Sequence, residues 1–151
     1  MGKSAAKAAG ARTRARELMV QALYQKQIAG HSTTELVAQY TEDPAYERVD
    51  KAFFDELFPE ISNTQGDIEK KVDGLIDRPL EQLDPIELSI LLIGVHELET
   101  RTDIPYKVVI NEGVNLAKRF GATESHKYIN ACLDVAAQSL REVEVSANAG
   151  G

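Results

Sequence analysis

The chain has 151 residues, of which 43% are hydrophobic, so it is long enough to bury a core as one domain or two small ones. No apolar run approaches the roughly 20 residues that a membrane-spanning helix needs, and no apolar segment of the signal-peptide kind follows the basic N-terminus. The single cysteine, Cys132, excludes an intramolecular disulfide and is typical of the reducing cytoplasm, where we expect the protein.

Charge is distributed unevenly along the chain. The 17 basic and 24 acidic residues give a net charge of −7, yet the first sixteen residues carry five basic side chains and no acidic one. The other 12 basic residues face all 24 acidic ones, so the rest of the chain carries −12. A basic N-terminal arm on an acidic body favours a local anion site, and a nucleic-acid backbone offers repeated phosphates to several arginines.

The hydrophobic pattern is helical throughout, without alternating strand periodicity. A first helix is expected from Arg12 to Ala29, with Gly30 as its stop. Arg12 and Arg16 lie on the same row as the apolar residues Met19 and Leu23, so we expect this charged pair at a bundle edge and not in the core. Arg14 points roughly the opposite way.

Caps and prolines mark the next boundaries. Ser32 and Glu35 have the spacing of a capping box, which predicts a second helix from there to about Tyr40. Two further helices are expected over about 47–58 and 64–76, each ending before a proline.

The clearest helix start is Asp84 followed by Pro85, an N-cap and a first helical residue. The helix that follows is apolar almost all round, which predicts a central, buried element, and Gly94 would allow a neighbour to approach closely. Two last helices are expected over about 106–120, ended by Gly121, and about 123–141.

About seven helices with short connections predict an all-α fold, built as two helical sub-bundles packed together. We expect a single helical domain over residues 12–141. Residues 1–11, which are small, polar and basic, and residues 142–151 are expected to be disordered tails.

Catalytic chemistry is poorly supported by the sequence. The three histidines are far apart in the chain, and none has the spacing of a metal-binding pair. Cys132 lies in the apolar stripe of the last helix, which favours a core role over a nucleophilic one. No phosphate-cradling glycine loop or dinucleotide fingerprint is present. We therefore predict a protein that is not an enzyme and needs no cofactor or metal.

The N-terminal arginines form the first candidate nucleic-acid site. Cations at a helix N-terminus oppose the helix dipole, so Arg12, Arg14 and Arg16 would gain from an incoming phosphate, which could also meet free backbone N–H groups. The alternative interpretation is a solvated helix end without a ligand.

A second candidate site surrounds Gly121. Lys118 and Phe120 precede it, and Lys127 and Tyr128 follow, so basic and aromatic residues alternate at a helix junction. Rings can stack on bases while lysines hold phosphates, as in proteins that bind single-stranded nucleic acid. The alternative is that Phe120 is a core residue and that the lysines are solvated surface residues without a ligand.

Several separated motifs resemble one family. The segment DIPYKVVINEGVNLAKRFGATESHKYIN, over residues 103–130, is similar to the signature of the NusB family of bacterial transcription antitermination factors. RARE at residues 14–17 and VQALY at residues 20–24 resemble the N-terminal motif of that family. The resemblance covers about residues 12–140.

The resemblance implies two three-helix bundles and no catalysis. It implies a heterodimer with NusE, a small-subunit ribosomal protein, that binds the boxA element of single-stranded nascent RNA, notably in ribosomal RNA leaders, and joins RNA polymerase to suppress premature termination. Glu124 falls where the family often has an acid beside the RNA. By the same resemblance, Glu87 and the exposed side of the central helix are the candidate contacts for NusE, a basic ribosomal protein that an acidic face would attract.

Two alternatives stay open at this point. The chain could be a helical protein–protein adaptor that does not bind RNA directly, or an accessory domain of the kind that precedes RNA methyltransferases. The sequence also leaves open whether the free protein forms a homodimer. In the RNA-binding interpretation, the cations and rings from the two ends of the chain are expected to meet on one exposed patch.

Overall fold

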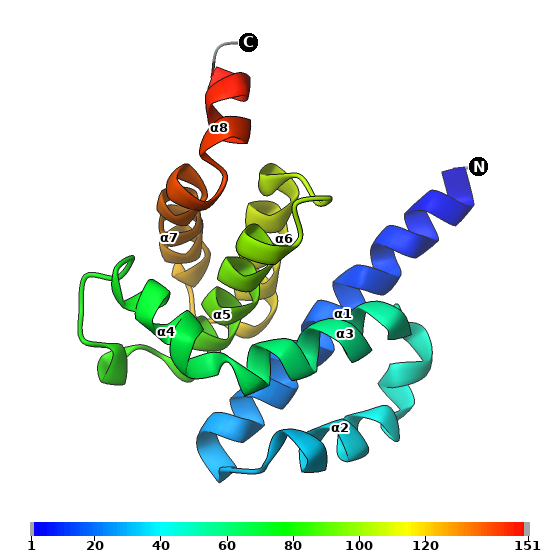
Figure 1. Cartoon of the computed structure of the whole chain (residues 1–151). Coiled ribbons are helices and arrows are strands. Elements are labelled where there is room, and N and C mark those ends of the chain that lie inside the picture. Colours follow the sequence, from blue (N-terminus) through cyan, green and yellow to red (C-terminus); the bar gives the residue numbers. More distant parts are fainter. Residues whose placement is uncertain (1, 150–151) are drawn as a thin grey trace. The chain divides into compact units, whose positions relative to one another are not determined.

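The computed structural model describes residues 2–149, and the side chains of residues 10–148 (Figure 1). All regular elements within these residues are helical, so the all-α prediction is confirmed. The chain divides into two compact units, residues 1–64 and residues 65–151. In the described part of the chain, no helix has the length and apolar character needed to cross a membrane.

The first unit contains three α-helices and one 3₁₀ turn, namely α1 (Gly2–Ala29), α2 (Thr33–Thr41), η1 (Pro44–Arg48) and α3 (Lys51–Asn63). The α1 helix packs against α2 and α3. The core between them is apolar and includes Phe54 and Phe58, whose rings stack with centroids 5.4 Å apart. The capping box predicted at Ser32 is present, because Ser32 and Glu35 each accept a hydrogen bond from the other's backbone N–H.

Two expected boundaries in this unit are wrong. The α1 helix begins at Gly2 and not at Arg12, because the alanine-rich segment before Arg12 has high helix propensity, so the expected N-terminal tail is helical. The α3 helix continues through Pro59 to Asn63. Leu57, Phe58 and Ile61 are fully buried around the proline, and their burial outweighs the ~3 kcal/mol that an interior proline costs.

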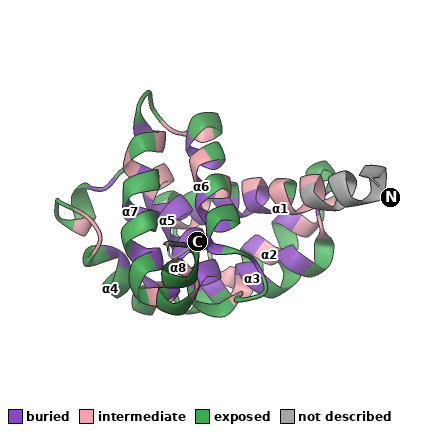
Figure 2. Ribbon diagram, turned by 90° about the horizontal axis from the view of Figure 1, so that it is seen from above, coloured by how far each residue is buried: buried purple, intermediate pink, exposed green. Residues whose placement is uncertain are grey.

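The second unit contains five α-helices and one short 3₁₀ turn, namely α4 (Gln65–Asp73), η2 (Leu80–Gln82), α5 (Pro85–Thr100), α6 (Tyr106–Phe120), α7 (Ser125–Leu140) and α8 (Glu142–Ala149). Its core lies among α5, α6 and α7, which pack against one another. As predicted, Asp84 caps α5 and Pro85 is its first residue. Figure 2 shows exposed residues along the outer surfaces of α6 and α7.

The central helix α5 is buried along most of its length, as its apolar sequence predicts. A Cβ atom at Gly94 would lie 2.6 Å from a terminal carbon of Leu133, and one at Gly113 of α6 would meet the same side chain equally closely. These two glycines therefore let α5 and α6 close around Leu133, which is fully buried. The close approach predicted at Gly94 is confirmed.

One arginine joins the end of the chain to this core. The Arg141 side chain is 3% exposed and donates to the carbonyl oxygens of Leu98 (2.6 Å), Arg101 (2.7 Å), Ile104 (2.9 Å) and Glu97 (3.2 Å). Its fifth hydrogen bond goes to Glu144 Oε1 at 2.7 Å. All five N–H donors of the guanidinium are thus used. The carbonyls of Glu97 and Arg101 also accept backbone bonds, so the guanidinium matters most for Leu98, in the last turn of α5, and for Ile104 in the following connection.

The expected disordered tail after residue 141 is therefore wrong in its first part, where α8 forms. Glu144 pairs with Arg141 and accepts a hydrogen bond from the backbone N–H of Tyr106 at 2.9 Å. This contact caps α6, whose own N-cap residue, Pro105, supplies no side-chain bond. The bonds from Tyr106 and Arg141 lower the pKa of the Glu144 carboxyl group. Long-range contacts of this kind order a segment whose composition suggests a tail.

Candidate nucleic-acid interface

The three N-terminal arginines lie in different environments on α1. Arg14 is exposed, Arg12 is half-buried and Arg16 is only 2% exposed. The guanidinium carbons of Arg12 and Arg16 lie 5.0 and 4.9 Å from the ring centroid of Phe53 in α3. Arg12 also donates from Nε to Asp50 at 3.4 Å. Two of the three cations are thus held by the fold of their own unit.

This geometry corrects two expectations. Arg16 lies in the core, where its stem packs among apolar residues and its charged head lies over Phe53, so it is not available to a phosphate. Because α1 begins at Gly2, the arginines lie inside the helix, where the backbone N–H groups are already bonded. Phosphate binding by this segment must therefore come from side chains, with Arg14 the most accessible and Arg12 partly so.

The second cluster surrounds the connection between α6 and α7. Lys118 and Lys127 are exposed, and Phe120 is half-buried with the guanidinium of Arg119 5.4 Å from its ring centroid. Glu124 is exposed, has the left-handed φ of 72°, and pairs with Lys127 Nζ at 2.5 Å. Lys118, Lys127 and part of the Phe120 ring therefore face solvent at this connection, and the charge of Lys127 is partly neutralised by Glu124.

Tyr128 contacts Asp77 and Arg78, an interaction that the sequence alone does not indicate. The guanidinium carbon of Arg78 lies 4.6 Å from its ring centroid, and the hydroxyl donates to Asp77 Oδ1 at 3.3 Å. Arg78 Nε in turn donates to the same carboxylate oxygen at 2.9 Å, and this bond lowers the pKa of Asp77. Burial raises the pKa of Tyr128 to about 12, so its hydroxyl stays protonated at neutral pH.

Glu87 lies in the first turn of α5 and is half-buried. Its Oε2 accepts a hydrogen bond from Ser125 Oγ at 2.7 Å, which links the starts of α5 and α7. The expected exposure of Glu87 is therefore only partial. A partner that contacts Glu87 would also approach the N-terminal turn of α7.

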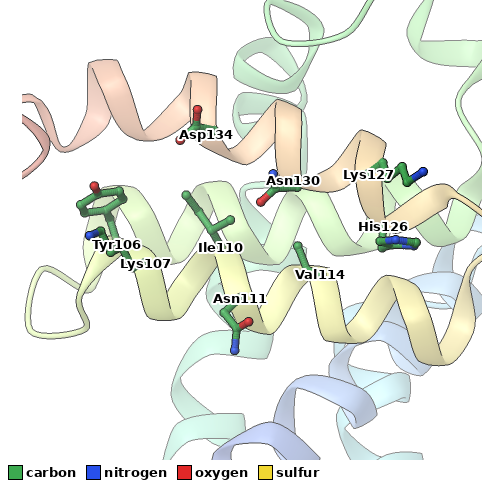
Figure 3. Close-up of a pocket in the computed structure, with 9 residues that line it drawn as sticks. All are labelled: Tyr106, Lys107, Ile110, Asn111, Val114, His126, Lys127, Asn130 and Asp134. Atoms are coloured by element: carbon green, nitrogen blue, oxygen red, sulfur yellow. The ribbon is translucent and has the colours of Figure 1, made fainter. Parts of the chain in front are cut away.

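A groove of about 460 Å³ runs between α6 and α7 beside Lys127. Figure 3 shows Ile110 and Val114 projecting from α6 toward α7, and Asn130 projecting from α7 toward α6. Lys107 and Lys127 lie near its two ends (Figure 3). The surface beside Lys127 thus combines an apolar floor with amide and ammonium groups.

Groups that could support metal or nucleophilic chemistry are not assembled here. Among the described side chains, no three His, Cys, Asp or Glu residues cluster in a way that could hold a metal ion. Cys132 is buried, donates weakly to the carbonyl of Leu75 at 3.6 Å, and has its pKa raised by burial. These features indicate the core role predicted for Cys132.

The predicted RNA-contact residues fall in both units of the chain. Arg12, Arg14 and Arg16 belong to the first unit, and Lys118, Phe120, Glu124, Lys127 and Tyr128 belong to the second. Within the second unit, the structure adds Asp77 and Arg78 to the residues around Tyr128. No sequence motif marks this pair, because their contact with Tyr128 spans about fifty residues of chain.

Comparison with known proteins gives a consistent result. The model of the NusB family matches residues 13–138. A transcription antitermination protein NusB of Pseudomonas entomophila is 47% identical over 137 residues, which are 91% of this chain and 82% of that protein. The NusB protein of Marinobacter nauticus is 41% identical over 143 residues, which are 95% of this chain and 90% of that protein.

A solved structure is also similar. The NusB protein of T. maritima, in a crystal form described as P3121, Form 2, aligns with a TM-score of 0.66 and 26% sequence identity. The alignment covers 84% of this chain and 90% of that chain. The helical arrangement and the sequence therefore point to the same group of proteins.

Proposed function

This chain belongs to the NusB family of transcription antitermination proteins, a family of non-enzymes, and we propose that it binds boxA-type RNA as a heterodimer with NusE. In this proposal the pair joins RNA polymerase in the cytoplasm and suppresses premature termination, notably in ribosomal RNA leaders. The support comes from the family membership and from exposed cations in both units of the chain.

The observation that carries the RNA-binding part is the surface around the α6–α7 connection. Exposed Lys118 lies within one turn of half-buried Phe120 in α6, and exposed Lys127 lies beside half-buried Tyr128 in α7. Phosphate-binding and base-stacking groups therefore occur in neighbouring pairs on both sides of the connection. Exposed Arg14 adds a further cation in the first unit. The binding is expected to be electrostatic in large part and therefore to weaken with salt.

Glu124 offers a test of this surface. Replacing Glu124 by Gln removes a negative charge beside the proposed RNA path and releases Lys127 from its ion pair. We expect RNA affinity to rise about threefold, because exposed pairs of this kind are worth only a few tenths of a kcal/mol to 1 kcal/mol. Fluorescence anisotropy with a boxA-like RNA measures the effect.

A matched control for that variant is Glu142→Gln, which removes one exposed acidic charge in the first turn of α8. It should leave RNA affinity unchanged. Unaltered or weaker binding by Glu124→Gln would show that Glu124 lies away from the RNA or accepts a hydrogen bond from a base.

The NusE contact is proposed at Glu87. An acidic residue at the start of α5 suits a basic ribosomal protein, so Glu87→Lys should weaken NusE binding at least tenfold by charge repulsion. Because Glu87 also accepts from Ser125, the lysine variant changes the fold locally, and Ser125→Ala is the control that removes only the internal bond. Equal NusE affinity of the Glu87→Lys and parent proteins, measured by calorimetry, would contradict this placement.

A further inference from the structure

The connection between α4 and η2, residues 74–79, is held against the N-terminal half of α7 by two contacts. Tyr128 donates its hydroxyl to Asp77, and Cys132 donates to the carbonyl of Leu75. Arg78 belongs to this connection and has its guanidinium over the Tyr128 ring. An arginine from a distant part of the sequence therefore covers one face of a ring that belongs to the proposed RNA surface.

These contacts fix the position of the Arg78 side chain but use only part of its hydrogen-bonding capacity. Its bond to Asp77 uses the Nε–H group, and 42% of the side chain stays exposed. The ion pair joins adjacent, solvent-exposed residues, a kind that contributes little to stability. The remaining N–H donors of the guanidinium have the fork geometry that suits a phosphate.

We propose that Arg78 is a further RNA-contacting residue, which binds a backbone phosphate while Tyr128 holds its guanidinium in place. Asp77 also fixes the orientation of the guanidinium, through the bond that it accepts from Nε–H. The inference rests on the proposed RNA-binding function and extends its site to the α4–η2 connection. The competing explanation is that Arg78 only braces this connection against α7.

The test compares Arg78→Gln, Arg78→Lys and the parent protein in RNA binding over a range of salt concentrations, with thermal unfolding measured alongside. Loss of one phosphate contact to a single strand should make the salt slope shallower by about 0.7, which corresponds to about fivefold weaker binding at 0.1 M salt. Arg78→Lys keeps the charge and should keep the slope. Lys70→Gln, which removes an exposed charge from α4, is the matched control and should bind as the parent does.

Each outcome decides between the two explanations. A shallower slope for Arg78→Gln alone, with melting temperature unchanged, supports the phosphate contact. If Arg78→Gln binds RNA with the affinity and salt slope of the parent protein, the phosphate contact is ruled out, whether or not the melting temperature falls. It is also ruled out if Arg78→Lys makes the salt slope as shallow as Arg78→Gln does. If the parent protein binds no RNA, the proposed function fails together with this inference. If the parent binds RNA and the Arg78 variants bind it equally well, only this inference fails.

Discussion

Replacing Arg141 by methionine is expected to lower the free energy of unfolding by about 4 kcal/mol. The buried guanidinium bonds four backbone carbonyls and the Glu144 carboxylate, and methionine fills part of the space without donating to any of them. The buried carbonyls of Leu98 and Ile104 would then lose their arginine donor, whereas those of Glu97 and Arg101 keep their backbone bonds. For a chain of this length the melting temperature should fall by about 10 °C, as measured by circular dichroism.

Two variants show whether the hydrogen bonds are the cause. Arg141→Lys keeps the charge, but a single ammonium group cannot reach all the carbonyls. The free energy of unfolding should therefore fall by less than in Arg141→Met. Arg14→Ala removes an arginine from an exposed position of α1 and should change stability by less than about 0.5 kcal/mol. A loss below about 1 kcal/mol for Arg141→Met would show that water or other groups satisfy the carbonyls.

Neutralising three exposed cations together should weaken RNA binding about 100-fold at 0.1 M salt. The variant carries Gln at Arg14, Lys118 and Lys127, none of which is buried. Each phosphate contact to a single strand adds about 0.7 to the slope of log affinity against log salt, so three lost contacts cost about two decades at this salt concentration. The same variant should retain the helical signal and melting temperature of the parent.

The slope of log affinity against log salt should also be measured for the parent protein. Four cations, with Arg12 as the fourth, predict a slope of about −2.8, and a contact from Arg78 would steepen it to about −3.5. A triple variant that neutralises the exposed cations Arg48, Lys51 and Lys70 carries the same change in net charge and is the control. Equal weakening by both triple variants would mean that net charge, and not the three chosen positions, determines RNA affinity.

Local sequence signals predicted much of the fold. The caps at Ser32 and Asp84 are formed as expected, and Gly121 follows the last residue of α6. These boundaries depend on side chains within three or four residues of each other, so the sequence contains all the information they need. The buried helix α5 was equally clear, because residues on all its sides are apolar.

Boundaries that depend on tertiary contacts were not predictable in this way. Pro59 looked like a helix end, yet the burial of its neighbours keeps α3 continuous. Residues after Arg141 looked like a tail, yet Glu144 docks α8 on the start of α6. In both cases, the deciding partners lie in other helices.

The candidate site was predictable in its residue types but not in their accessibility. The arginine spacing on α1 could not show that Phe53 lies beneath Arg16 and draws it into the core. Nor could it show that Arg78 stacks on Tyr128, because no local pattern links the two residues. Cation–π contacts between distant segments leave no periodic signal in the sequence.

The most direct test of the central claim is the affinity of the full-length protein for a boxA-like RNA and for a scrambled RNA of equal length, with and without NusE, at 0.1 M salt. We expect the boxA-like RNA to bind at least tenfold more tightly than the scrambled one when NusE is present. Equal affinity for the two RNAs with NusE bound, or no measurable binding of either, would contradict the account and favour a helical adaptor that does not bind RNA.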